Sequence, residues 1–336
     1  MFTTISESSE SAIELRSQDQ LVYDLREVIL RKPFICGYGR KDSMRQRQTL
    51  KVGLILALPL ILYFFGFFLY PLFSLFQSAF TTASNVPTLN NFRSMLTDSL
   101  LKTSLENTAY YFTGSVVVEY SIGFGVAVLL YHYTGRLKCI FRTAIFLPLM
   151  ASPVVIGLMW LLILNTDFGP LNYLLSLIGV QPLNWLGSQS LGMPSLIMAN
   201  GWEYSPFVFL IIYAGLQTVP QQFYEAASVD GLTRLQTFRF ITLPSITPSL
   251  LVAFLLNAIG VLKGFDLIYV LTNGGPGYST YILSFYTYVV GFSFFEPHYA
   301  SALALLFLLM IGAFVFVMLR FTALEDYLGL KRVKER

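Results

Sequence analysis

Six long apolar runs dominate the hydrophobic and polar pattern of this 336-residue chain. They cover roughly residues 52–76, 107–131, 143–164, 191–216, 247–271 and 299–320. A helix needs about 20 mostly apolar residues to cross the hydrocarbon core of a bilayer, and each run is long enough. The pattern therefore predicts an all-α integral membrane protein with six transmembrane helices.

Composition agrees with this interpretation and removes several others. Only 12% of the residues are charged and 55% are hydrophobic, whereas soluble domains carry about 25% charged residues. The net charge of +3 is too small to suggest nucleic-acid binding. Cys36 and Cys139 form no CxxC motif and no cluster with histidine, so we expect no metal site and no disulfide framework.

Basic residues indicate how the predicted helices are oriented. The two ends of the chain and the loops after the second and fourth runs hold 19 Lys and Arg residues, with Arg320 counted at the inner end of the sixth run, and the other three loops hold 2. Cytoplasmic loops of membrane proteins carry the excess of Lys and Arg. We therefore expect both termini in the cytoplasm, as six crossings also require.

The runs divide the chain into three parts. We expect residues 1–50 to be a cytoplasmic N-terminal tail, residues 51–322 to be the six-helix transmembrane domain, and residues 323–336 to be a cytoplasmic C-terminal tail. The start of the chain has no apolar stretch typical of a cleavable signal peptide, so the first run is expected to remain as a membrane span.

Two further helices are predicted outside the apolar runs. In the N-terminal tail, one helical face carries Leu21, Val22, Leu25, Val28 and Ile29. Its polar face mixes acids and bases, which leaves open a docking or membrane-surface helix and a solvated tail. In the outer loop, residues 165–190, we expect a short interfacial helix followed by a turn at Pro182.

The cytoplasmic loop at residues 217–246 predicts two short helices. Pro220 can open the first, which continues through good helix formers, and Gly231 allows the backbone to leave it in a left-handed conformation. We expect the second helix to break at Pro244, before the fifth run. Glu225 and Asp230 offer carboxylates to a partner, although composition alone favours a plain helical loop between spans.

The spacing of residues in this loop resembles a known motif. Glu225-Ala226-Ala227, three residues, Gly231, nine residues and then Ile241-Thr242-Leu243-Pro244 is similar to the EAA motif of ABC importer permeases. In that family the loop is a coupling helix that inserts into a cleft on the ATP-binding subunit. The resemblance implies the same role for a set of five residues: Glu225, Ala226, Ala227, Asp230 and Gly231.

A second resemblance concerns the class of solute. The segment from Leu271 to Pro276, reading LTNGGP, is followed by Thr280, Leu283 and Tyr286, and is similar to the outer loop of carbohydrate-type permeases of the maltose and glycerol-3-phosphate branch. The likeness covers about residues 50–325. It implies a multi-pass permease of the cell inner (plasma) membrane that imports a sugar or sugar-like solute, such as an oligosaccharide, a polyol or a glycoside osmolyte.

The same resemblance implies which partners the chain has. They are a second homologous permease subunit, two ATP-binding subunits, a solute-binding protein and the lipid bilayer, with no nucleic acid. ATP and Mg would be bound by the partner subunits, so we expect no cofactor and no enzymatic activity in this chain. Its sequence contains no GxxxxGK[ST] motif for nucleotide binding.

Polar and small residues within the runs suggest where a solute would pass, because polar groups inside a membrane usually face a pathway or a partner helix. Gly260 and Gly264 either open room for a ligand or pack against another helix, and the pattern alone leaves both open. Contact positions of maltose-type permeases align with Asn200, Glu203, Tyr204, Phe207, Asn257, Gly260, Val261 and Gly264. Glu203 and Val261 depart from the family's residue types, which puts maltose itself in doubt.

Three other charged residues lie within the runs. Lys263 and Asp266 are three residues apart, and we favour a structural pair between them over a role in transport. Glu119 lies deep in the second run, and the sequence does not identify its partner.

Two other classes of protein fit the sequence less well. A membrane enzyme would need converging catalytic groups, but His132 and His298 fall at opposite ends of the predicted spans and no HExxH or GxSxG motif is present. A secondary transporter would favour a series of membrane acids or histidines, or paired inverted repeats. The solute stays open between sugars, polyols, glycerol-3-phosphate and other small polar molecules, and the lack of an arginine cluster in the runs disfavours a phosphate ester.

Overall fold

The computed structural model describes residues 56–133 and 135–334, with side chains to residue 320. The predicted N-terminal tail, including its amphipathic face, lies outside these residues. The chain divides into two compact units, Met1–Pro71 and Leu72–Arg336. From the first unit only helical residues 56–71 are described, and the packing below concerns the second.

The described part of the chain is helical apart from loops and one isolated bridge between Thr81 and Pro87. A helix from Leu56 to Ala79 contains the π-helical turn η1 (Phe65–Leu69) and α3 (Tyr70–Ala79). The elements that follow are α4 (Asn90–Met95), α5 (Ser99–His132), α6 (Lys138–Phe146), η2 (Pro148–Met150), α7 (Pro153–Ile163), α8 (Pro170–Leu177), α9 (Gly192–Gln217), α10 (Gln221–Val229), α11 (Arg234–Thr237), η3 (Phe238–Thr242), α12 (Leu243–Leu262), α13 (Asp266–Leu271), α14 (Leu283–Tyr288), η4 (Val289–Ser293) and α15 (Pro297–Lys334).

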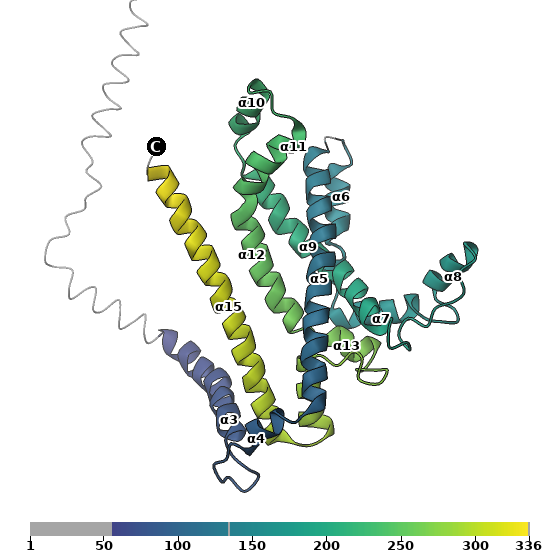
Figure 1. Ribbon diagram of the computed structural model, residues 1–336, viewed down its shortest axis with the longest axis vertical. Helices are drawn as coiled ribbons and strands as arrows, with labels where there is room; N and C mark the ends of the chain where they lie inside the picture. Colours follow the sequence, from purple (N-terminus) through teal and green to yellow (C-terminus); the bar gives the residue numbers. More distant parts are fainter. Residues whose placement is uncertain (1–55, 134, 335–336) are drawn as a thin grey trace, which may run out of the picture. The chain divides into compact units, whose positions relative to one another are not determined.

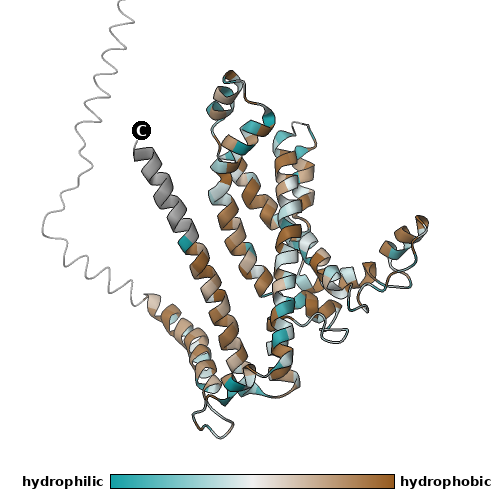
Figure 2. Ribbon diagram, in the orientation of Figure 1, coloured by the Kyte–Doolittle hydropathy of each residue, from teal (hydrophilic) through white to brown (hydrophobic). Residues whose placement is uncertain are grey.

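Five of these helical segments are long and apolar enough to cross a membrane, and a sixth crossing is formed if a bent pair counts as one span. The result agrees with the six predicted spans. Figure 2 shows that most residues of α9, of α12 and of the coloured part of α15 are apolar. The predicted short helix in the outer loop is present as α8.

Helices α5, α9 and α12 pack against one another and form the centre of the second unit (Figure 1). The backbones of α5 and α9 come close together at Gly123. A Cβ atom there would lie 2.7 Å from the carbonyl oxygen of Ser205 and 3.0 Å from the backbone nitrogen of Phe209. Only glycine allows two helix backbones to come this close, so Gly123 sets the separation of these helices.

The third predicted span, 143–164, is not one straight helix. Instead, helices Lys138–Met150 and Pro153–Ile163 meet at an angle of 99°. Ser152 between them has an extended backbone, with φ −68° and ψ 141°. The residue before a proline is driven away from the helical region, which explains why the helix breaks before Pro153.

The fifth run also differs from the prediction, at both ends. The predicted break at Pro244 is wrong, because the π-helical turn η3 passes directly into α12, with the amide of Leu243 bonded to the carbonyl of Phe238. A π turn shifts the hydrogen-bond pattern by one residue and so accommodates a proline, which has no N–H to donate. The outer end of the run is interrupted at 263–265, which separates α13 from α12.

Hydrogen bonds of Asp98 hold the ends of three elements together. Asp98 caps α5 by accepting from the amides of Leu100 and Leu101, and its Oδ2 accepts from the hydroxyls of Tyr286 and Tyr299, each at 2.6 Å. Burial raises the pKa of Asp98, but these hydrogen bonds stabilise the charged form and the net pKa is lowered. Asp98 therefore fastens α5 to α14 and α15.

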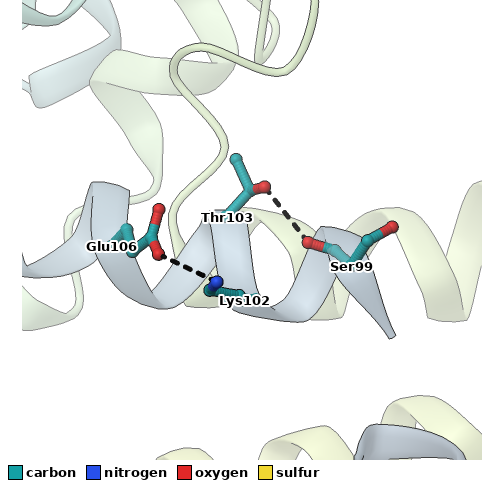
Figure 3. A network of polar contacts seen from close by, with 4 residues as sticks. All are labelled: Ser99, Lys102, Thr103 and Glu106. Carbon is teal, nitrogen blue, oxygen red and sulfur yellow. Dashed lines mark hydrogen bonds and ion pairs between the residues drawn. The ribbon is translucent and has the colours of Figure 1, made fainter. Parts of the chain in front are cut away.

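One side of the first turns of α5 carries polar side chains (Figure 3): Lys102 lies 3.9 Å from Glu106, and Thr103 donates to the carbonyl of Ser99. The opposite end of α5 lies at the same end of the second unit as α10 and α11 (Figure 1). This end also carries basic residues of the two loops there, including Arg136, Lys138 and Arg234.

We predict that Gly123→Ala destabilises the protein. The added methyl group meets backbone atoms of α9, which cannot rotate away, and overpacking of this kind costs about 1–3 kcal/mol. Gly125→Ala is the matched control, because a Cβ atom there meets nothing within 4 Å. Thermal unfolding of purified protein in detergent should show a lower midpoint for Gly123→Ala alone, and equal midpoints would contradict the close contact.

Candidate functional site

The carboxylate of Glu119 is the hydrogen-bonding centre of the helix core. Its side chain is fully buried on α5. Asn200 of α9 donates from Nδ2 to Oε1 of Glu119, and Asn257 of α12 donates from Nδ2 to Oε2. One carboxylate thus joins all three central helices, and the structure supplies the partners of Glu119 that the sequence could not identify.

This arrangement fixes the orientation of both asparagine side chains. An amide group has an oxygen that accepts and a nitrogen that donates, and only the nitrogen can face a carboxylate. Each oxygen of Glu119 therefore takes one amide N–H, and the amide oxygens of Asn200 and Asn257 are turned away from it. We refer to Glu119, Asn200 and Asn257 as the carboxylate clamp.

A small cavity lies beside the clamp. Its volume is about 20 Å³, far below the roughly 300–1,000 Å³ typical of ligand pockets, so it does not admit a sugar ring in this conformation. The residues that line it come from α5, α7, α9, α12, α13 and the break before α13: Tyr111, Pro153, Asn200, Glu203, Tyr204, Gly260, Gly264, Phe265, Asp266 and Leu267.

Two buried polar atoms at this cavity have no hydrogen-bond partner in the described part of the chain. They are Oε2 of Glu203, whose residue is 3% exposed, and the hydroxyl of Tyr111, whose residue is 1% exposed. A buried polar group without a partner is costly, by about 1–3 kcal/mol. Such groups mark a place where a ligand that supplies the missing partners would bind favourably.

The structure brings together most of the predicted pathway residues. Five of the eight line the cavity: Asn200, Glu203, Tyr204, Gly260 and Gly264. Asn257 belongs to the clamp, Val261 packs in the apolar core, and Phe207 is half-buried away from the cavity wall.

Gly260 of α12 and Gly264 of the break after it differ in their surroundings. A Cβ atom at Gly264 would lie 3.0 Å from Cε1 of Tyr111, whereas one at Gly260 would meet nothing within 4 Å. Helix packing within this chain therefore accounts for Gly264 and not for Gly260.

Sequence reasoning missed five residues of the cavity wall, and two of them, Tyr111 and Asp266, have polar side chains. Tyr111 shares the buried face of α5 with Glu119, eight residues further on, and this shared face is the signal that could have found it. The favoured pair between Lys263 and Asp266 is wrong: among the described side chains they form no ion pair. The helix ends at Leu262, and Asp266 begins α13, so the two residues do not share a helical face.

The loop between α9 and α12 is exposed and consists of two short helices, α10 and α11, joined by a tight turn. Helix α10 ends in a Schellman motif, in which Gly231 has φ +74° and donates to the carbonyl of Ser228, and Leu232 donates to that of Ala227. Thr233 and Gln236 then form a capping box that starts α11. The left-handed conformation predicted at Gly231 is therefore confirmed.

The predicted coupling residues lie in this loop, and all but one of them are on its exposed face. Glu225, Ala226 and Asp230 are exposed, whereas Ala227 is buried beneath them. An apolar groove of about 320 Å³ runs between α10 and the start of α12. Thr242 donates to the Tyr224 hydroxyl at 3.3 Å and so ties α10 to η3.

These features define a multi-pass membrane protein with a polar site in its helix core and an exposed loop of short helices at one end. Residues 120–325 match the family model of the binding-protein-dependent transport system inner membrane component. The chain belongs to this family of inner membrane transport permeases.

Curated relatives and a solved structure agree with the family. The chain is 36% identical over 226 residues to a probable ABC transporter permease, y4oQ, of Sinorhizobium fredii, which covers 67% of this chain and 72% of that protein. It is 32% identical over 290 residues to the trehalose/maltose transport system permease MalF of Thermococcus litoralis, covering 83% and 96%. Its fold resembles a chain of a bacterial ABC transporter that imports the acidic polysaccharide alginate, with a TM-score of 0.74 at 23% identity over 83% and 96% of the two chains.

We predict that the clamp tolerates an exchange of its groups but not the loss of one. Glu119→Gln replaces one acceptor by a donor and sets two N–H groups against each other, and Asn200→Asp alone places two carboxylates side by side. Hydrogen bonds to charged groups contribute about 1.5–3 kcal/mol, so each single variant should unfold at a lower temperature in detergent.

The double variant Glu119→Gln/Asn200→Asp restores one donor for each acceptor and should recover most of the lost stability. If the two effects simply add in the double variant, the two side chains do not interact.

Proposed function

We propose that this chain is the permease subunit of an ATP-driven importer, and that it forms the pathway for a sugar or sugar-like solute. The docking loop, residues 217–246, carries the proposal. It presents a short rigid helix with small and acidic residues at the end of two helices that line the core, which is the arrangement needed to receive force from a partner.

The coupling residues have distinct roles in this proposal. Glu225 and Asp230 offer exposed carboxylates to a basic partner surface, and Ala226 allows close approach. Ala227 packs inward and Gly231 ends α10, so both set the angle at which the helix is presented. A push on α10 is transmitted to α9 and α12 because the loop connects them directly.

In this proposal, partner subunits complete the transporter. Two ATP-binding subunits would bind ATP and Mg and dock on the loops of two permeases, this chain and a homologous second one. A solute-binding protein would deliver cargo to the outer loops. In support, a solved alginate transporter of the same fold is described in complex with its periplasmic protein bound to an alginate pentasaccharide.

The orientation follows from charge. Arg136, Lys138, Arg234 and other basic residues lie at the end of the second unit that carries the docking loop (Figure 1). The excess of Lys and Arg marks the cytoplasmic side. We therefore place the docking loop and both termini in the cytoplasm.

Relatives support a carbohydrate as the solute. Four of those at 29–32% identity are described as permeases for trehalose and maltose, arabinooligosaccharides, sulfoquinovosyl glycerol and lactose. These solutes share many hydroxyl groups, which the polar residues of the cavity can bind. Glycerol-3-phosphate or another small polar solute is the alternative, and a secondary transporter is a more distant one.

Reconstitution tests the proposal directly. Proteoliposomes that contain both permeases and the ATP-binding subunits, supplied with the binding protein, should accumulate solute only with ATP. The solute is identified beforehand by a thermal-shift screen of the binding protein against sugars and polyols. Uptake that persists without ATP and collapses with a protonophore would show a secondary transporter instead.

We predict that Glu225→Lys and Gly231→Pro abolish solute uptake in these vesicles while the protein still inserts. The first reverses a charge on the docking surface. The second cannot adopt φ +74°, because proline fixes φ near about −65°. Glu106→Lys, an exposed site at the far end of the chain's α5 helix, is the control and should transport normally. Normal uptake by both loop variants would contradict the docking role.

A further inference from the structure

The cavity beside the clamp presents hydrogen-bond acceptors to whatever enters it. Glu203 offers an unpaired Oε2, and Asp266 adds a second carboxylate to the wall. Asn200 has committed an amide N–H to Glu119, which turns its amide oxygen away from the clamp. The hydroxyls of Tyr111 and Tyr204 in the same wall can donate or accept. The carboxyl and amide oxygens favour groups that donate, such as hydroxyl or ammonium groups.

Positive charge is missing from the same wall. None of the ten residues that line the cavity is Lys or Arg. Lys263 adjoins Gly264 in the sequence, but its side chain is exposed and does not line the cavity. A carboxylate, sulfonate or phosphate on the solute would therefore meet the buried carboxyl group of Glu203 and the exposed one of Asp266 without a compensating cation in the wall, which disfavours an anion.

We infer that the cavity selects an uncharged polyhydroxylated solute and rejects an anionic one, with Glu203 as the specificity-determining residue and Glu119 as the positioning residue that orients Asn200 and Asn257. The inference rests on the proposed importer function and narrows its cargo. Names of relatives do not decide the matter, because they include both lactose and an acidic polysaccharide.

The test compares uptake of matched solutes by the reconstituted importer. The vesicles hold ATP in their lumen, on the side of the ATP-binding subunits. An equimolar mixture of trehalose, maltose, lactose, trigalacturonate and glucose 6-phosphate is added outside, and the imported solutes are measured by mass spectrometry. The same binding protein is used throughout, so a difference between permease variants reports on the permease. Wild type should import one of the uncharged sugars at least about tenfold faster than either anion, a difference of about 1.4 kcal/mol.

Four permease variants separate the roles of the residues. Glu203→Gln keeps the shape of the side chain but removes a charge, and should reduce the preference for the uncharged sugar by about fivefold or more, a change of at least about 1 kcal/mol. Glu106→Gln, an exposed acid outside the cavity, should leave the preference unchanged. Glu119→Gln should raise the KM for the uncharged sugar more than it lowers kcat. The double variant Glu119→Gln/Asn200→Asp should reverse that change.

Each outcome tests either the inference about the solute or the proposed importer function. ATP-dependent import of trigalacturonate or glucose 6-phosphate at the rate of the sugars would overturn the inference and leave the importer intact. A preference unchanged by Glu203→Gln would overturn the role of Glu203. Absence of any ATP-dependent uptake, with the solute found by the binding-protein screen included as a positive control, would overturn the proposed function itself.

Discussion

The buried carboxylate of Glu119 is the interaction on which the rest of the core depends. A buried carboxyl group in a membrane protein is expensive unless it is hydrogen-bonded, and here Asn200 and Asn257 satisfy one oxygen each. Because the three residues come from three helices, the hydrogen bonds fix how α5, α9 and α12 lie relative to one another. Apolar packing supplies close contact, but it tolerates sliding, whereas a carboxylate with two amide donors specifies one register.

The docking loop and the clamp act on the same helices. Helix α9 ends and α12 begins within a few residues of α10, α11 and η3. The loop is stiffened by the Schellman motif at Gly231 and by the contact between Tyr224 and Thr242. A displacement of α10 must therefore move α9 and α12, and any difference between their movements is felt at Glu119. In this conformation the cavity next to the clamp is too small for a sugar, so transport requires these helices to separate.

Much of the fold could be predicted from the sequence, because membrane spans and end signals are local features. The apolar runs predicted the spanning helices, and Gly231 was identified as the end of α10 from its residue type alone. The bend at Pro153 and the continuous helix through Pro244 were not predicted. Proline indicates that the backbone must adjust, but whether it breaks the helix or forms a π turn depends on packing with neighbouring helices.

The site was predicted only in part, for a physical reason. Asn200, Glu203 and Gly264 were proposed through a family resemblance, and the structure gathers them at one cavity. The role of Glu119 depends on two residues that lie 81 and 138 positions away. No periodicity within one helix can reveal a partner on another. The predicted pair of Lys263 and Asp266 failed for a related reason. Their spacing of three residues suggested that they share a helical face, but the helix ends at Leu262.

The most direct test of the clamp is a distance measurement between α5 and α12. Spin labels at the exposed residues Leu129 and Val252 report on the separation of these helices by pulsed electron paramagnetic resonance. In the nucleotide-free transporter, wild type should give one narrow distance distribution, and Glu119→Gln should give a broader or shifted one. Identical distributions in the two proteins would contradict the claim that Glu119 fixes the arrangement of the core helices.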